Sequence, residues 1–114
     1  MSAADVVSCV RAAGLPVVRM AWPKGSAPPL PWCAFYLEET RGFCSDNELY
    51  APRSTWVVEL YQRSSDPEVE AALERSIAST FGPYDKTDAW IEDEGCIQTA
   101  YRFAQIENQE VHNG

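Results

Sequence analysis

Few side chains in this sequence could act as acids, bases or nucleophiles, and their positions do not favour catalysis. The only histidine is His112, which lies in a polar segment close to the C-terminus. A general base must be held in a fixed geometry, and a terminal segment of this kind does not provide one. A serine or cysteine triad would need another histidine, which the chain lacks. We therefore expect a protein that is not an enzyme and that binds no cofactor.

Acidic residues occur in two groups that could bind a metal ion. Glu38 and Glu39 are neighbours in a predicted strand, so their side chains should point to opposite faces of the sheet. Glu92, Asp93 and Glu94 lie at the tip of a predicted hairpin, but they lack the ligand spacing of a calcium loop. We interpret this tip as a solvated turn. The alternative is a patch that contacts a protein or repels DNA.

The four cysteines, Cys9, Cys33, Cys44 and Cys96, do not have the short spacing of a zinc site. Cys9 falls on the apolar side of a predicted helix, whereas Cys33 and Cys96 fall inside predicted strands. We interpret them as small buried apolar side chains and expect no metal. A metal site or a reactive thiol is the alternative.

Composition and charge limit the classes of partner. The chain has 17 acidic and 9 basic residues, which gives a net charge of −8. Nucleic-acid binding needs clustered lysine and arginine, so we expect none, and we expect no membrane binding. No apolar run approaches the roughly 20 residues of a membrane helix. The N-terminus has no basic segment leading into an apolar one, which favours synthesis in a cytoplasm with reduced thiols.

The elements that must position these residues can be predicted from the hydrophobic pattern. We expect a single domain over residues 1–114, with residues 107–114 as a disordered tail. Residues 3–13 should form a helix capped by Ser2, and a second helix should follow Asp66-Pro67 and end at Gly82.

Alternating apolar positions predict the strands. They cover residues 15–21, 32–39 and 53–63, with a short edge strand at Leu49 and Tyr50 and a hairpin of residues 84–91 and 96–106 around a turn. Both faces of residues 32–39 are apolar, so we expect this strand to be central or covered on both sides. The predicted class is α+β, a mainly antiparallel sheet with two helices packed on one face, in the order α-β-β-β-α-β-β.

Aromatic residues and a proline-rich segment are the strongest hints of an interface. Residues 22–31 contain four prolines and should form an exposed loop, to which Trp22 and Leu30 add apolar surface. This loop either packs on its own domain or docks on a neighbouring subunit. The tryptophans Trp22, Trp32, Trp56 and Trp90 do not all fit easily in one small core. They either line the sheet or form a protein interface, where tryptophan is favoured.

An ordered set of landmarks runs through residues 5–106. They are Leu15-Pro16-Val17, Ala27-Pro28-Pro29-Leu30-Pro31, Trp32-Cys33-Ala34-Phe35-Tyr36, Ser45-Asp46-Asn47, Tyr50, Val57-Val58-Glu59-Leu60-Tyr61, Asp66-Pro67, Glu70, Leu73, Tyr84, Trp90-Ile91-Glu92-Asp93-Glu94, Gln98 and Tyr101. In this order the set resembles the small tail-completion (tail terminator) proteins of long-tailed bacteriophages and prophages, in the version common in Gram-positive bacteria.

The resemblance implies a structural role in the virion. Such proteins form a ring, a hexamer in the assembled tail, at the head-proximal end of the tail tube. The ring ends tube growth and joins the tail to the head, so its partners would be the tail tube protein and the head connector. DNA would only pass through its centre, and the protein would move from the host bacterial cytoplasm into the virion tail. The resemblance supplies no binding residues.

The residue-level interpretation agrees with such a ring. An acidic channel would let DNA slide without binding. A closed ring uses head-to-tail interfaces, for which each subunit needs two different surfaces. Our candidate protein-contact residues are Trp22, Leu30, Trp32, Glu92, Asp93 and Glu94.

Two other functions stay open. The chain could be another phage neck or minor tail component. It could also be a small acidic inhibitor or immunity-type protein that binds a basic partner through charge.

Overall fold

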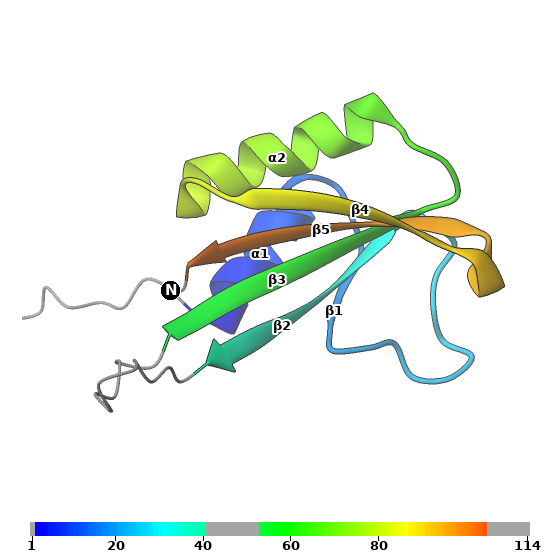
Figure 1. The fold of residues 1–114 in the computed structure, drawn as a ribbon, viewed down its shortest axis with the longest axis horizontal. Coiled ribbons are helices and arrows are strands. Elements are labelled where there is room, and N and C mark those ends of the chain that lie inside the picture. Colours follow the sequence, from blue (N-terminus) through cyan, green and yellow to red (C-terminus); the bar gives the residue numbers. More distant parts are fainter. Residues whose placement is uncertain (1, 41–52, 105–114) are drawn as a thin grey trace, which may run out of the picture.

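The computed structural model describes residues 2–40 and 53–104 and consists of a twisted sheet with two helices (Figure 1). In chain order the elements are α1 (Ala3–Ala12), β1 (Val17–Arg19), β2 (Trp32–Thr40), β3 (Arg53–Gln62), α2 (Pro67–Phe81), β4 (Asp85–Ile91), the 3-10 helix η1 (Glu92–Glu94) and β5 (Cys96–Ala104). The α+β class with two helices is therefore confirmed.

The sheet is mixed, so the prediction of a mainly antiparallel sheet is wrong. Its strand order is β1-β2-β3-β5-β4, and β1 lies parallel to β2, whereas β2, β3, β5 and β4 pair antiparallel to their neighbours. A parallel pair needs a crossover of about a dozen residues or more, and residues 20–31 provide it. The element order also differs from the predicted one, because η1 forms at the hairpin tip.

The helices begin and end where the sequence places their caps. Ser2 and Asp5 form a capping box at the start of α1. The Asp66 side chain accepts hydrogen bonds from the backbone N–H groups of Glu68 and Val69 at the start of α2. Gly82 ends α2 with φ of 94°, a conformation that favours glycine. At the hairpin tip, Gly95 has φ of 61°, as the turn prediction required.

β1 is shorter than predicted because the chain turns sharply at Met20. This residue has φ of 71°, and the Ala21 N–H donates to the Arg19 carbonyl at 2.9 Å, which closes a γ-turn. The Met20 N–H itself still donates to the Phe35 carbonyl of β2 at 2.7 Å. The strand therefore pairs with β2 up to Met20 and then leaves the sheet.

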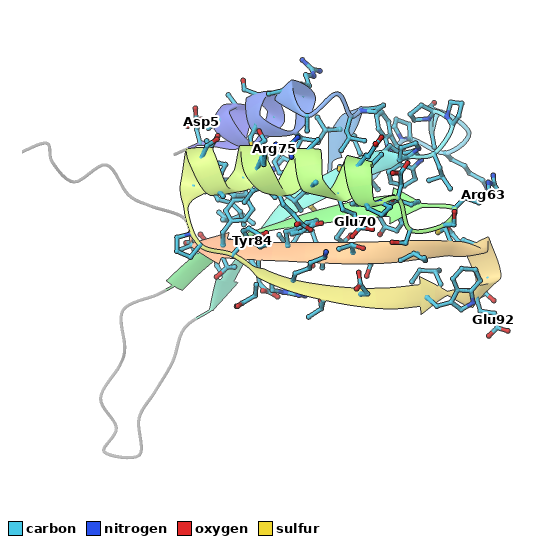
Figure 2. All side chains as sticks on the ribbon, turned by 90° about the horizontal axis from the view of Figure 1, so that it is seen from above. Asp5, Arg63, Glu70, Arg75, Tyr84 and Glu92 are labelled. Carbon is cyan, nitrogen blue, oxygen red and sulfur yellow. The ribbon has the colours of Figure 1, made fainter. Side chains whose placement is uncertain are left out.

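Both helices pack on one face of the sheet and share its core with alternate strand residues. We call this the covered face. Ser76 of α2 donates to the Cys9 carbonyl of α1 at 2.7 Å, and the two helices lie side by side (Figure 2). The core consists of Val6, Cys9, Val10, Leu15, Cys33, Phe35, Trp56, Val58, Leu60, Leu73, Ile77, Phe81, Tyr101 and Phe103.

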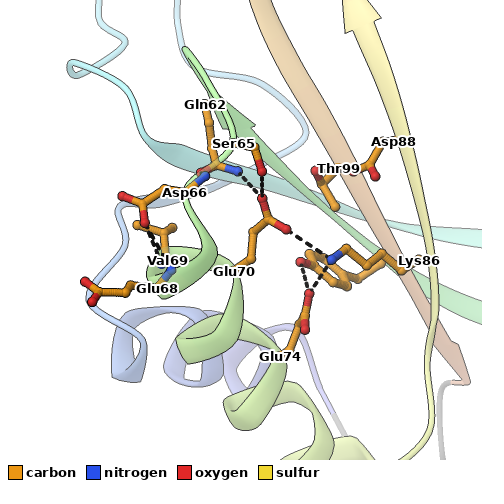
Figure 3. A network of polar contacts seen from close by, with 11 residues as sticks. Gln62, Ser65, Asp66, Glu68, Val69, Glu70, Glu74, Lys86, Asp88 and Thr99 are labelled. Atoms are coloured by element: carbon orange, nitrogen blue, oxygen red, sulfur yellow. Dashed lines mark hydrogen bonds and ion pairs between the residues drawn. The ribbon is translucent and has the colours of Figure 1, made fainter.

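A polar network joins α2 to the edge strand β4 (Figure 3). The Lys86 ammonium group lies 2.7 Å from a Glu74 carboxylate oxygen and 3.1 Å from one of Glu70. The hydrogen bond to Glu74 is the largest of the contacts that hold the pKa of Lys86 above its ordinary value. Because every residue of β4 except Ile91 is exposed, this network is the main polar tie between β4 and the helix layer.

Several predictions fall outside the described residues. They are the turn at 41–47, the short strand at Leu49 and Tyr50, Cys44, His112 and the tail of residues 107–114. Among residues 2–40 and 53–104, neither helix is long and apolar enough to cross a membrane.

Candidate protein-contact surface

No described helix packs on the face of the sheet opposite α1 and α2, and we call this the open face. Strand alternation places Trp32, Tyr36, Glu59 and Tyr61 on this face, because their neighbours Cys33, Phe35, Val58 and Leu60 belong to the core. The expectation that β2 would be central, or covered on both sides, is confirmed in its first form, because β2 lies between β1 and β3.

Small side chains occupy the centre of the open face. Ala34, Val57 and Ala100 are almost completely buried even though neither described helix covers them. Larger side chains on neighbouring positions of the same face shield them from water, and Tyr36 pairs directly with Val57. The centre of the open face therefore consists of small apolar side chains, and larger aromatic and charged side chains surround them.

A row of aromatic rings crosses one end of the open face. Trp22 meets Trp32 edge-to-face with 5.8 Å between ring centroids, and Trp32 lies on Tyr61 at 4.6 Å. Gln98 continues the row on β5, where its side-chain N–H donates to the Tyr61 hydroxyl at 2.8 Å. We call Trp22, Trp32 and Tyr61 the aromatic row. The rings are half-buried, so each keeps part of its surface available to a partner.

A carboxylate fixes the orientation of the tyrosines. The Tyr61 hydroxyl donates to Glu59 at 3.0 Å, and the Tyr36 hydroxyl donates to the other oxygen of the same carboxylate at 3.4 Å. Burial raises the pKa of Tyr61 to about 12, and burial together with the nearby Glu59 charge also raises the pKa of Tyr36. Both phenols therefore stay protonated near neutral pH, which suits hydrogen bonding better than proton transfer.

A shallow hollow of about 470 Å³ lies beside the aromatic row, between the proline-rich loop and the start of α2. Leu30 and Pro31 form one wall, and the segment from Gln62 to Pro67 forms the other. Gln62 is only 2% exposed, and its amide is satisfied by Glu70 and by the backbone N–H of Asp66. The polar groups on this wall thus serve the helix cap.

The structure gathers the predicted contact residues at one end of the sheet. Trp22, Leu30 and Trp32 lie where β2 begins, and Glu92, Asp93 and Glu94 lie where β4 ends and β5 begins. β2 and β4 run in opposite directions, because three successive antiparallel pairings connect them, so the start of β2 and the end of β4 lie at the same end of the sheet. Trp22 packs on Trp32 of its own domain, as one of the two alternatives for the proline-rich loop expected.

The candidate contact residues chosen from the sequence did not include Tyr36, Glu59 or Tyr61. The spacing of Glu59 and Tyr61 puts both on one face of a strand, which is a usable signal. Their contact with Trp32 and Gln98, however, depends on the register of β2 and β5 against β3, which no local pattern gives. The Trp22 indole N–H is buried and has no hydrogen-bond partner among the described residues.

The prediction that the cysteines are buried is confirmed for Cys9, Cys33 and Cys96. None of these three cysteines forms a disulfide with another described residue. Burial raises the pKa of Cys33 strongly, and burial followed by the Glu94 charge raises the pKa of Cys96, so neither thiol is activated. Within the part of the chain that the structure describes, no group of three or more His, Cys, Asp or Glu side chains could hold a metal ion.

The comparisons with known proteins leave the family open. No protein-family model matches the chain, and no curated protein has a matching sequence.

Proposed function

We propose that this chain is a non-enzymatic virion structural protein that forms a ring at the head-proximal end of a phage tail tube. In this role it ends tube growth and joins the tail to the head. The observation that carries the proposal is the open face, a sheet surface with a fixed row of half-buried aromatic rings and no described helix above it. The resemblance of the ordered landmarks to tail terminator proteins supplies the kind of assembly.

The chemistry of the open face supports binding to a protein. Tryptophan and tyrosine are enriched at the centres of protein interfaces, where they supply large contact areas. The hydrogen bonds from Tyr36 and Tyr61 to Glu59 hold the rings in place before any partner arrives. Association then costs less side-chain entropy, because few rotamers are lost on binding. We assign this surface to the contact with the end of the tube.

The charge of the chain fits the passage of DNA. A net charge of −8 does not favour binding of DNA in the channel, since phosphates bind to clustered cations. The partners in this proposal are further copies of the chain, the tail tube protein and the head connector. The protein would act in the host bacterial cytoplasm during assembly and then in the virion tail.

The test is negative-stain electron microscopy of the purified chain, alone and mixed with tubes of the major tail tube protein from the same genome. We expect rings, or tubes that carry extra density at one end and stop growing. Monomers that leave every tube end bare would contradict the proposal. Salt-sensitive binding to a single cationic protein would then favour the inhibitor function.

A variant can link the tube contact to the open face. Tyr36→Lys places a cation on this face next to Glu59 and should abolish tube capping while circular dichroism stays unchanged. Arg75→Glu is the matched control, because Arg75 is an exposed residue on α2 in the helix layer (Figure 2). If Arg75→Glu blocks capping and Tyr36→Lys does not, the tube contact lies on the helix layer.

A further inference from the structure

Two large apolar side chains stand out on the surface of the described residues. Met20 is 68% exposed and Trp90 is 60% exposed. Met20 directly follows β1, and Trp90 lies in β4, so the two residues belong to opposite edges of the sheet. Figure 2 shows the same separation, with α1 and the loop after β1 on one side of the molecule and β4 on the other.

The charges on the two edges have opposite signs. Residues 6–37 contain no acidic side chain but include Arg11, Arg19 and Lys24. β4 and η1 contain a single cation, Lys86, which is already bound by Glu70 and Glu74. Their acidic residues are Asp85, Asp88, Glu92, Asp93 and Glu94. A chain of net charge −8 thus keeps a positive region on one side of its sheet and a concentrated negative region on the other.

We infer that the β1 edge of one copy of this chain binds the β4 edge of a second copy. We call the first surface, with Arg19, Met20 and Lys24, the basic edge. The second, with Trp90, Glu92, Asp93 and Glu94, is the acidic edge. This inference rests on the proposed function in taking a further copy of the chain as the partner, and it names the surfaces that join neighbouring subunits.

Charge complementarity selects a second copy as the occupant. A head-to-tail contact needs two different surfaces on each subunit that fit one another, and the two edges meet this condition. Exposed methionine next to exposed tryptophan gives a favourable contact of sulfur with an aromatic ring. Like edges would instead bring together two acidic or two basic surfaces, which repel each other.

The backbone at both edges fits such a contact. β4 is an edge strand that leaves one row of backbone groups unpaired with any described strand, and such edges favour association. Met20 holds a positive φ that is rare for a residue other than glycine, although its side chain gains little from its own domain. A strained residue of this kind is often kept for a functional contact.

Cysteine cross-linking tests which edges meet. One sample carries Met20→Cys and a second carries Trp90→Cys, and both are oxidised separately and as an equal mixture. We expect a disulfide-linked dimer mainly between the unlike variants, with at least tenfold less between like ones. The native described cysteines are buried, and the oxidised wild-type chain gives the background. Equal yields from like and unlike pairs would overturn the inference.

Double variants test the contact without a covalent bond. Met20→Asn/Lys24→Glu damages the basic edge, with asparagine chosen because it tolerates a positive φ. Trp90→Thr/Asp93→Lys damages the acidic edge and keeps a strand-forming residue in β4. Each variant alone should lose self-association at least tenfold in sedimentation velocity, whereas Arg75→Glu should match the wild type. Variants that assemble like the wild type would overturn the inference.

The two proposals can fail separately. If the wild-type chain does not bind tube ends but the cysteine variants still cross-link through unlike edges, the phage role is overturned and the edge contact stands. Chains that cap tubes but show no preference for unlike edges would overturn only the edge contact.

Discussion

Both faces of the sheet carry aromatic side chains, but the rings have different environments on each face. On the covered face, Phe35 lies against Trp56 and Phe81 against Phe103, and all four rings are almost completely buried. On the open face, the rings of Trp32 and Tyr61 are only half-buried, and the Tyr61 hydroxyl donates to Glu59 and accepts from Gln98. Aromatic content alone therefore does not distinguish a core from an interface, but the exposed surface that the rings keep does.

The comparison predicts that substitutions on the covered face mainly change stability. Leu73 is fully buried between α2 and the sheet, so Leu73→Ala should lower the free energy of unfolding by about 2–5 kcal/mol. Urea denaturation followed by circular dichroism measures this loss. A change below about 1 kcal/mol would mean that the covered face is not the stabilising core.

Substitutions on the open face should change association more than stability. Trp32→Ala removes ring contacts with Trp22 and Tyr61, which should cost about 1–2 kcal/mol of unfolding free energy. The same variant should no longer cap tail tubes, whereas a covered-face variant such as Ile77→Val should still cap them. Normal capping by Trp32→Ala would remove the functional difference between the faces.

The network that ties β4 to α2 should make stability depend on acid. Burial alone would raise the pKa of Glu70, but hydrogen bonds from Ser65, Gln62 and Lys86 outweigh it and hold the pKa below its ordinary value of 4.5. The stabilisation is then present above pH 4.5 and is lost as the pH falls through the lowered, folded-state pKa.

Glu70→Gln should abolish this part of the acid dependence. Because both partners are partly exposed to solvent, we expect it to amount to about 1 kcal/mol at most. Unfolding free energies of the two proteins at pH 7 and at pH 3 provide the measurement. An unchanged acid dependence in Glu70→Gln would place the titrating group elsewhere.

The smallest effect is expected at Trp22. Trp22→Phe removes some apolar contact with Trp32 but also removes a buried N–H that has no partner among the described residues. These two changes oppose each other, so the free energy of unfolding should shift by less than about 1 kcal/mol. A larger loss in thermal or urea unfolding would reveal a hydrogen bond to this indole.

Local signals in the sequence were enough for the helices and the hairpin. Ser2, Asp66, Gly82 and Gly95 act through their own backbone and near neighbours, so their roles can be predicted from type and spacing. The cysteines in strands and on the helix stripe were predicted as buried for the same reason.

Non-local pairing could not be predicted in this way. The parallel placement of β1 depends on where the loop of residues 20–31 returns the chain, and the turn at Met20 has no glycine or asparagine to announce it. The apolar alternation of β2 was correctly predicted as a strand. Whether Trp32 and Tyr36 contact a helix depends on which face the helices cover, and the two helices that the structure describes lie on the other face.

The place of β5 in the sheet has a consequence for synthesis. This strand follows every other described strand in the sequence, yet it lies between β3 and β4 and is the only described strand that pairs with β4. While a ribosome still holds residues 96–104, β4 has no sheet to join. A chain truncated before β5 would therefore lack an ordered β4, and only molecules translated through β5 would present both edges to a neighbour.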